Sequence, residues 1–402
     1  MRTLSGIGVY LHDCYRRSGD IIWSNSGTLN FIKTLNLADK LNLAVAIKPE
    51  SEVDKSPAVI LKDKDSDIHL FPLPAWKNTS QTIKALPGNI KLFAERALQL
   101  SKESELIWIR TPSVVAPFFY YYARKSKKPI ILHIAGNILR AARKQKYSGI
   151  SLLATKLIAW GMHIVSKWMT RGSLTFVTGE ELKKLFSSPL HPVHFLDDIL
   201  LDKKDLLPPK KSRGQATKLL FVGQFAPGKG IEVLLDALMD LTKQFRDLNL
   251  FLAGTGPLLE PMRERIRQMG IENHAKLLGF VSPKGRLQKL YRNCDIFIQP
   301  SDSYAEGFPR VILEAWAAGL PVVATRLGGV PYRVRHGENG LLATPGSKDE
   351  LRELIKNLIS DADLRYRLSL SGYQTVKFLT FETQEKKIKS LIKEYFPNLN
   401  LA

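Results

Sequence analysis

The sequence is poor in cysteine, has no long apolar run and lacks the pattern of a secretion signal. Its 402 residues include two cysteines, Cys14 and Cys294, far apart in the chain. That spacing excludes a disulfide framework or a cysteine metal cluster and favours a reducing compartment. No run reaches the roughly 18 consecutive apolar residues that a transmembrane helix needs, and polar residues interrupt the segment where a signal peptide would be apolar. We therefore expect a cytoplasmic protein.

Acidic side chains are missing from one long segment, between Glu105 and Glu180. The same segment holds twelve lysines and arginines, and the whole chain carries a net charge of +21 (59 − 38). Such an imbalance favours a polyanionic partner: nucleic acid, an anionic membrane surface or a phosphorylated substrate. An ordinary solvated face of a basic protein is the alternative.

The pattern of apolar residues predicts two domains, each with a parallel sheet and helices on both faces. A chain of 402 residues is too long for one ordinary core. In the first half, strand-like runs stand at 7–11, 43–47, 106–109 and 129–133. A polar loop follows the first run, and helical spacing covers 28–41. The strand–helix alternation is typical of doubly wound α/β domains.

A polar, proline-containing segment at 203–217 predicts a linker between the two domains. The alternation restarts behind it. Predicted strands lie at 218–222, 248–253, 276–278, 296–299 and 322–324. Predicted helices lie at 230–242, 258–269, 284–293, 311–318 and 348–359. We therefore expect an N-terminal domain at 1–202, the linker, a second domain at 218–377 and a final segment at 378–402.

A glycine-containing loop follows the first strand of the second domain, with the sequence Gly-Gln-Phe-Ala-Pro-Gly-Lys-Gly at 223–230. Glycines allow backbone N–H groups to approach an anion, and the start of the next helix favours negative charge. Lys229 stands at that helix start, where it can neutralise a phosphate. A glycine turn between a strand and a helix is more often structural, so the loop alone is a weak signal.

Two carboxylates, Glu306 and Glu314, stand eight residues apart around the start of a predicted helix. Two helical turns span about 11 Å, so the two groups can contact different parts of one ligand. Glu314 lies in an otherwise apolar helix, where an unpaired carboxylate is costly, which favours a ligand or a partner. The alternative is an incidental buried acid. Amide groups at the helix start would point toward a pyrophosphate; they belong to Phe308, Arg310, Val311 and Ile312.

These features occur together in an order that resembles the nucleotide-sugar domain of family 4 glycosyltransferases, retaining enzymes of the GT-B fold also described as glycosyl transferases group 1. The resemblance runs from Gly223 to about Phe381. Its motifs are the loop at 223–230, Ala-Gly-Thr-Gly-Pro at 253–257, Leu-Gly-Phe-Val at 278–281, the glutamate pair, Gly-Leu-Pro-Val-Val-Ala at 319–324, Gly-Gly-Val-Pro at 328–331 and His-Gly-x-Asn-Gly at 336–340.

The resemblance implies roles for the residues of the second domain. Glu306 would act on the donor sugar as a catalytic residue, with Gly307 beside it, and Glu314 would hold the ribose hydroxyls. Lys229, with Gly228, would stabilise the leaving diphosphate. The backbone at Phe280 and Val281 would flank the base. Family members need no metal and no cofactor beyond the nucleotide-diphosphate sugar, which is the donor substrate.

In the first domain the resemblance is weaker. It implies that His133, at the end of a predicted strand, is an active-site histidine and that Gly27 faces the donor phosphates. It also implies that the last helix, 381–396, crosses back to the first domain. Three positions depart from the family pattern: Gln224 replaces a usual arginine, the Asn-Gly turn at the domain junction is missing, and Ser-Asn-Ser-Gly at 24–27 replaces a glycine pair.

The segment Ile150–Met169 has the pattern of an amphipathic helix within the acid-free region. Its apolar residues at near-helical spacing are Leu152, Leu153, Leu157, Trp160, Ile164 and Trp168. Lys156, His163 and Lys167 fall on another face. A basic, aromatic helix of this kind can lie on an anionic bilayer. A buried helix of the first domain is the alternative.

We therefore expect a retaining glycosyltransferase that moves a sugar to a saccharide or lipid-linked acceptor in surface polysaccharide or glycolipid synthesis, at the inner face of a membrane. A non-catalytic binding protein of the same fold is the alternative, supported by Gln224. Nucleic-acid binding rests on charge alone and explains none of the glutamate spacing, so we expect no nucleic-acid partner. An epimerase or phosphorylase of similar fold fits the loops less well.

Overall fold

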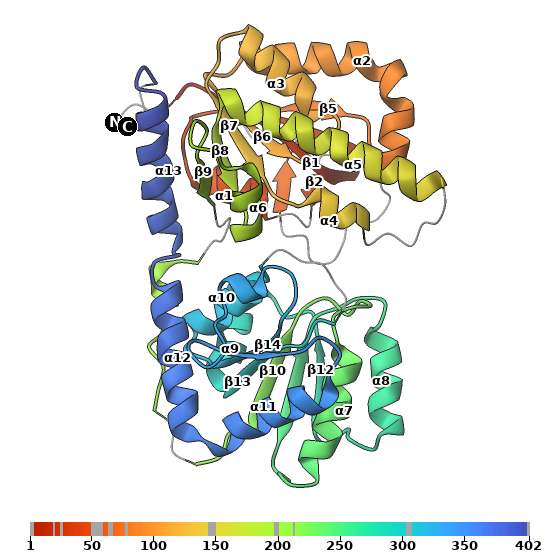
Figure 1. The fold of residues 1–402 in the computed structure, drawn as a ribbon, viewed down its shortest axis with the longest axis vertical. Helices are drawn as coiled ribbons and strands as arrows, with labels where there is room; N and C mark the ends of the chain where they lie inside the picture. Colours follow the sequence, from red (N-terminus) through yellow and green to blue (C-terminus); the bar gives the residue numbers. More distant parts are fainter. Residues whose placement is uncertain are drawn as a thin grey trace. The chain divides into compact units, whose positions relative to one another are not determined.

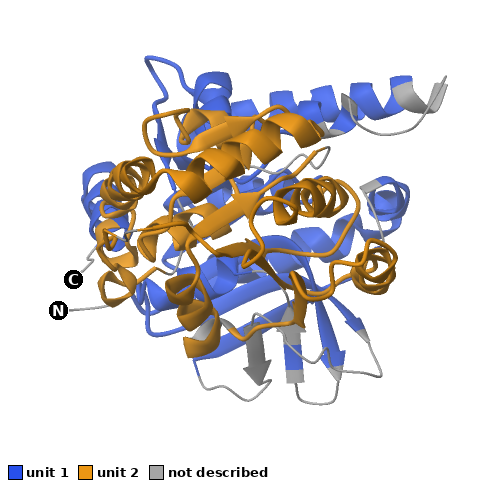
Figure 2. Ribbon diagram, turned by 90° about the horizontal axis from the view of Figure 1, so that it is seen from below, with its two compact units in different colours: residues 1–198, 384–402 blue, residues 199–383 orange. Residues whose placement is uncertain are grey.

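The chain forms two compact units, residues 1–198 with 384–402 and residues 199–383 (Figures 1 and 2). The structure is a computed structural model, and it describes residues 4–18, 21–24, 27–49, 59–62, 67–76, 79–143, 150–196, 201–211, 214–302 and 308–399. The predicted linker at 203–217 lies near the start of the second unit and opens with a 3-10 turn, Lys203–Asp205.

The sheet of the first unit has a parallel body in the order β5-β3-β1-β6-β7-β8-β9. Its strands are β1 (Ile7–Ser18), β3 (Leu41–Pro49), β5 (Ile68–Leu73), β6 (Leu106–Thr111), β7 (Ile130–Ile134), β8 (Leu174–Val177) and β9 (Val193–Phe195). From β1 the chain first builds outward through β3 and β5 and then returns to the other side of β1 with β6. Such a reversal marks where an α/β sheet binds ligands, at the carboxyl ends of the two central strands.

The first strand is longer than its apolar run, which corrects the prediction of a polar loop after residue 11. β1 continues to Ser18 after a register shift between Tyr10 and Cys14. Its last residues pair antiparallel with β2 (Ile21–Ser24), which in turn pairs with β4 (Val59–Lys62). Charged side chains at Arg16 and Arg17 hide this strand from a hydropathy pattern, because backbone pairing rather than an apolar face defines it.

Helix α1 (Thr28–Thr34) is shorter than the predicted 28–41, because Asn36 takes a left-handed conformation (φ 47°) just behind the helix, and Leu41 then begins β3. The other helices of the unit are α2 (Thr79–Lys102), α3 (Ala116–Lys125), α4 (Ile138–Arg143), α5 (Ile150–Met169) and α6 (Glu180–Phe186), with a 3-10 turn, Thr170–Gly172, after α5. Buried side chains of α2 and α3, among them Phe93 and Phe119, pack on the alternate strand residues Ile107 and Ile109.

The sheet of the second unit is parallel throughout, in the order β12-β11-β10-β13-β14-β15. Its strands are β10 (Lys218–Val222), β11 (Asn249–Ala253), β12 (Ala275–Gly279), β13 (Ile296–Gln299), β14 (Val322–Thr325) and β15 (Leu341–Ala343). The predicted strands at 218–222 and 296–299 are confirmed residue for residue. The order reverses between β10 and β13, so these two strands define the switch point of this unit.

Helices cover both faces of the second sheet. They are α7 (Ile231–Thr242), α8 (Leu259–Gln268), α9 (Gln288–Asn293), α10 (Arg310–Ala317), α11 (Lys348–Ser360) and α12 (Ala362–Val376), with short turns at Pro283–Leu287 and Val330–Tyr332. Leu219 and Phe221 of β10 belong to one buried cluster with α7, whereas Leu220 belongs to another with Trp316 of α10. This alternation is what a strand buried on both faces requires. The last helix, α13 (Phe381–Tyr395), continues into the first unit from residue 384.

Candidate functional site

The loops that follow β10, β11 and β13 gather at the switch point of the second unit. The amide of Phe225 donates to the carbonyl of Thr255 at 2.8 Å, and the amide of Leu258 donates back to Phe225 at 2.9 Å. The amide of Asp302, behind β13, donates to the carbonyl of Gly228 at 3.1 Å. Backbone hydrogen bonds therefore connect three loops that are up to 77 residues apart in sequence (302 − 225), at the edge where α/β sheets bind ligands.

Glycines in these loops are required by close backbone approach. A Cβ on Gly254 would overlap the carbonyl oxygen of Gly223, and one on Gly230 would overlap the carbonyl oxygen of Pro300. Both glycines also have positive φ, +145° and +70°, which side-chain-bearing residues rarely adopt. The motif glycines are thus explained by how tightly the loops pack on one another.

Lys229 is the cation of the loop after β10. It lies directly before Gly230, the residue that caps α7, and its side chain is almost fully buried. Gly228 before it has a φ of +88°. The start of α7 presents N–H groups and a positive helix end, so a lysine at this point adds to a potential that favours an anion. The geometry suits a phosphate group.

Glu314 lies in the second turn of α10, and its carboxylate accepts a hydrogen bond from the hydroxyl of Tyr291 in α9 at 3.0 Å. Burial raises the pKa of Glu314, while the Tyr291 bond and the charge of Arg310 lower it in part. Burial and the nearby carboxylate also raise the pKa of the Tyr291 hydroxyl, which keeps it protonated as a donor. The carboxylate is therefore held in place by a side chain that the sequence reasoning missed, because nothing local connects positions 291 and 314.

Sequence reasoning identified Phe308 and the motif at 336–340 but missed the contacts that Arg333 and Trp316 make around α10. The guanidinium of Arg333 lies over the ring of Phe308, 5.0 Å from its centre. The indole N–H of Trp316 donates to the carbonyl of Asn339 at 3.0 Å, and the amide side chain of Asn339 donates to the carbonyl of Arg333 at 2.9 Å. The segment from 333 to 339 is thereby fixed against α10. The motif at 336–340 is the signal that could have located these contacts.

The amides at the start of α10 are less open to a ligand than predicted. Pro309 caps the helix, and the amide of Ile312 donates to the carbonyl of Pro309 at 3.1 Å. The Ile312 side chain is fully buried. The Ile312 amide therefore already has an acceptor within the first turn, and its role toward a pyrophosphate stays a prediction. Arg310 is exposed and Val311 is half-buried.

The loop after β12 carries the residues predicted to flank a base. Phe280 is exposed and Val281 is half-buried. The amide of Gly254 donates to the carbonyl of Gly279 at 2.8 Å, so this loop is joined to the one after β11. An exposed aromatic ring next to the glycine loops is a surface on which a planar base can stack.

Glu306 and Gly307 lie outside the described residues. The structure places Lys229, Gly228, Glu314, Phe280, Val281, Phe308, Arg310 and Val311 at the carboxyl edge of the second sheet or in α10 and the loops around it. His133 and Gly27 belong to the first unit.

His133, at the end of β7, is fully buried. Its Nε2 lies 3.2 Å from the hydroxyl of Thr178, and its ring meets the edge of Trp108. This environment is typical of a packed histidine. Gly27 caps α1 with a φ of −78°, a conformation open to any residue, so its backbone does not require glycine.

The switch point of the first unit is occupied by side chains. Arg110 at the end of β6 contacts both carboxylate oxygens of Asp13 in β1 at 2.7 Å, and both side chains are largely buried. The hydroxyls of Tyr10 and Ser113 lie 2.6 Å apart next to this pair. The two central strands of this sheet are thus joined by an ion pair where the second unit has glycine loops.

Residues 202–375 match the family described as Glycosyl transferases group 1. This part of the chain belongs to that family. The match covers β10 to α12, and it includes every loop of the site described in the second unit.

Curated glycosyltransferases match a little under half of the chain. An uncharacterised glycosyltransferase of Methanocaldococcus jannaschii is 34% identical over 175 residues, 44% of this chain and 47% of the relative. The D-inositol 3-phosphate glycosyltransferase of Corynebacterium glutamicum is 31% identical over 187 residues, 45% of this chain and 44% of the relative. The chain therefore spans about half the length of the curated relatives it matches.

The solved structures extend the likeness to both units. Anabaena HepE in complex with UDP aligns with a TM-score of 0.67 over 96% of this chain and 99% of HepE, at 18% identity. The lipopolysaccharide outer core galactosyltransferase WaaB aligns with a TM-score of 0.65 over 98% and 100%, at 16% identity. At this identity the likeness shows the fold alone, which is the GT-B fold of two Rossmann-like domains.

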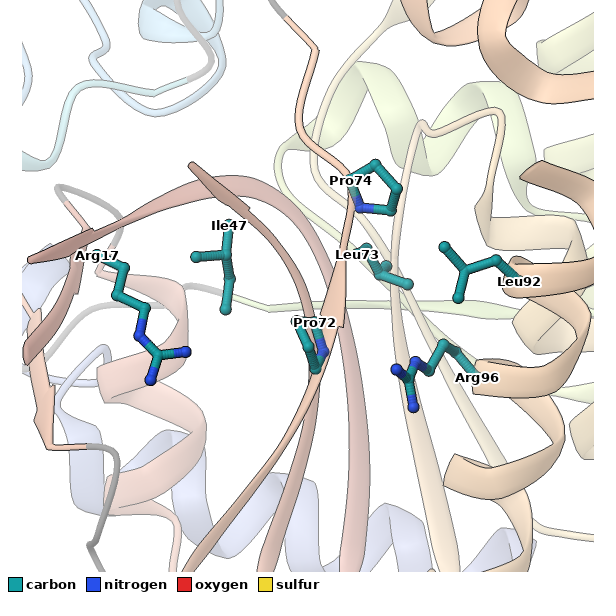
Figure 3. A pocket seen from close by; sticks show the side chains of 7 residues that line it. All are labelled: Arg17, Ile47, Pro72, Leu73, Pro74, Leu92 and Arg96. Carbon is teal, nitrogen blue, oxygen red and sulfur yellow. The ribbon is translucent and has the colours of Figure 1, made fainter. Parts of the chain in front are cut away.

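The first unit has an open cavity of about 510 Å³ between β5 and α2 (Figure 3). It is lined by Arg17, Ile47, Pro72, Leu73, Pro74, Leu92 and Arg96. Figure 3 shows the guanidinium groups of Arg17 and Arg96 on either side of Pro72. None of the predicted site residues lines this cavity.

No helix among the described residues is both long and apolar enough to cross a membrane. In the same part of the chain, no group of three His, Cys, Asp or Glu side chains is placed to hold a metal ion.

Proposed function

We propose that the chain is a retaining glycosyltransferase that moves a hexose from a nucleoside-diphosphate sugar to a saccharide or lipid-linked acceptor. The observation that carries the proposal is the second unit's switch point, where three loops joined by backbone hydrogen bonds surround the buried Lys229 at the start of α7. Family membership of residues 202–375 supports it. So does the likeness to HepE, whose structures hold UDP and UDP-glucose.

Lys229 would face the diphosphate. Negative charge grows on the leaving diphosphate as the glycosidic bond breaks, and a fixed cation with helix-start amides stabilises that charge without a metal ion. Glu314 would accept hydrogen bonds from the ribose hydroxyls, because an ionised carboxylate has several acceptor positions and Tyr291 occupies one. Phe280 would stack on the base.

Glu306, with Gly307 beside it, would contact the hydroxyls of the donor sugar near the reacting carbon. This assignment rests on the order of the motifs, since both residues lie outside the described part of the chain. His133 is fully buried, and its catalytic role stays a prediction. Gly27 and the cytoplasmic location remain predictions.

The acceptor would be a polyol, a saccharide or a lipid-linked sugar in surface polysaccharide or glycolipid synthesis, with the enzyme at a membrane surface. Relatives named for such acceptors support this range, among them a phosphatidyl-myo-inositol mannosyltransferase of Mycobacterium leprae, 33% identical over 162 residues. The donor base stays open, because HepE was solved with UDP while a Mycobacterium tuberculosis relative is named GDP-mannose-dependent.

The test has two steps. Thermal shift with UDP-, GDP- and ADP-sugars identifies the donor, and release of nucleoside diphosphate in the presence of a lipid or saccharide acceptor measures transfer. Lys229→Ala abolishes the shift, whereas Lys289→Ala, which removes an exposed lysine in α9, leaves it unchanged. Donor binding without release under any acceptor would favour the non-catalytic alternative, and no shift with any donor would contradict the proposal.

A further inference from the structure

One face of helix α5 packs on the rest of the first unit. Ala159, Ser166 and Met169 are buried. The hydroxyl of Ser166 lies 3.3 Å from that of Thr111 in β6, and the ring of His163 packs on Phe186. The helix is therefore docked along one side, and Figure 1 shows it as a long helix on the outside of the unit.

The opposite side of α5 is an apolar stripe open to solvent. Its members are Leu153, Leu157, Trp160, Ile164 and Trp168, with 43% to 60% of their surface exposed. Steps of three and four residues keep all five within an arc of about 80° on a helix of 3.6 residues per turn. The side chain of Leu152 lies outside the described residues. The buried-helix alternative is thus wrong for this stripe, since it faces away from the core.

Positive charge borders the stripe. Lys156 and Lys167 are exposed on its flank, and Arg171 is exposed in the turn behind α5. Trp168 packs edge-on against Tyr120 of α3, 5.0 Å between ring centres. This contact brings the end of α3, with exposed Arg124 and Lys125, close to the same patch. Because the sequence from 106 to 179 contains no acidic residue, no carboxylate from this segment offsets these charges.

We infer that α5 lies flat on an anionic lipid membrane, with the stripe in the boundary between headgroups and acyl chains. Tryptophan is favoured at that depth, aliphatic side chains reach into the acyl region, and lysines at the flank meet lipid phosphates. A second copy of the chain fits less well, because pairing two identical stripes would bring their basic flanks together. The helix lies on the surface and does not cross it.

The inference rests on the proposed function only in explaining why the surface is useful, since a lipid-linked acceptor is found at a membrane. Binding to vesicles needs neither donor nor acceptor. Donor binding in the second unit is measured by thermal shift without lipid. A negative result in vesicle binding would therefore not affect the donor-binding result, and a negative donor-binding result would not affect vesicle binding.

Vesicle flotation of the full chain tests the inference, with phosphatidylcholine vesicles compared with phosphatidylcholine–phosphatidylglycerol vesicles. We expect strong partition to the anionic vesicles that weakens with salt. Trp160→Glu should lower the partition coefficient about tenfold or more, since burial of one large apolar side chain is lost. Lys156→Gln and Lys167→Gln should each lower it about fivefold.

The matched control is Leu190→Glu, the same type of change at a residue that is 85% exposed and lies outside α5. It should bind vesicles like the unchanged chain. Circular dichroism and melting temperature show that each variant is folded. Equal binding by Trp160→Glu and Leu190→Glu overturns the inference. A chain that ignores vesicles but forms dimers, which Trp160→Glu dissolves, overturns it in favour of a second copy.

Discussion

The two sheets reverse their strand order in the same way, but different groups make the contacts at the two switch points. In the second unit the edge is built from backbone: loops after β10, β11 and β13 bond to one another, and glycines permit the contact. In the first unit the edge is built from side chains, with Asp13 and Arg110 joining β1 to β6. A backbone-built site constrains sequence and leaves a motif, whereas a side-chain-built site can be assembled from many residue pairs.

The family match covers only the unit whose switch point is built from backbone. The group 1 family match ends at residue 375 and begins at 202, so it leaves out the whole first unit. In the proposed function the second unit handles a donor of fixed chemistry and the first unit an acceptor that differs between enzymes. A shared donor requires shared loops, and a variable acceptor does not.

The largest expected effect comes from breaking the backbone-built edge. Gly254→Ala would force a Cβ into the carbonyl oxygen of Gly223 at a positive φ. We expect a loss of about 3 kcal/mol or more in unfolding free energy, together with loss of donor binding. Gly270→Ala is the matched control: its φ is +65° but no atom lies within 4 Å of the added carbon. It should cost about 1 kcal/mol. Denaturant unfolding that shows equal costs for the two variants would contradict the account.

The second-largest effect is expected from removing the Lys229 ammonium group. Lys229→Ala is expected to lower kcat/KM about 100-fold, because a preorganised charge on the leaving group is lost. Lys229→Arg should recover part of this, since it keeps the charge with a different shape. Steady-state release of nucleoside diphosphate measures both variants. Full activity of the Lys229→Ala variant would contradict the assignment of Lys229 to the leaving diphosphate.

Breaking the side-chain contact at the switch point of the first unit should lower the free energy of unfolding and leave donor binding unchanged. Asp13→Asn removes one partner of a largely buried ion pair and leaves Arg110 without its counter-charge. We expect a loss of about 2 kcal/mol, below that of a fully buried pair. Donor-induced thermal shifts should keep their size. A collapse of donor binding in this variant would show that the two edges do not act separately.

The smallest effect concerns Glu314 and pH. Burial raises the pKa of this carboxyl in the folded chain, so folding favours its protonated form. The protonated carboxyl therefore contributes to folding stability in acid, and this contribution is lost as pH rises through the raised pKa. Glu314→Gln keeps an acceptor for Tyr291 but carries no charge. It should melt about 2 °C higher at pH 7, with the gain fading toward pH 4. A variant that melts lower at pH 7 would contradict this.

The sequence predicted the second unit better than the first, for physical reasons. Strands 218–222 and 296–299 are buried on both faces and read as short apolar runs. The end of β1 carries polar residues and is defined by pairing alone, and β2 has only four residues, so no periodicity marks either segment. The extent of α5, Ile150–Met169, was predicted correctly, yet its pattern fitted a buried and a surface helix equally.

The candidate site, like the fold, could be predicted from the sequence only where its residues follow one another locally. The glycine loops and Lys229 could be located from local sequence, since strand, loop and helix start follow one another there. Tyr291 could not, because it reaches Glu314 only through the packing of α9 beside α10. Nor could the burial of His133, since strand ends expose some side chains and cover others.

A crystal structure with a nucleoside diphosphate bound tests the central claim most directly. The account predicts the diphosphate at the start of α7, within hydrogen-bond distance of the Lys229 ammonium, and the ribose hydroxyls on the carboxylate of Glu314. A nucleotide bound away from the loops after β10 and β13, with Glu314 contacting only Tyr291, would contradict it.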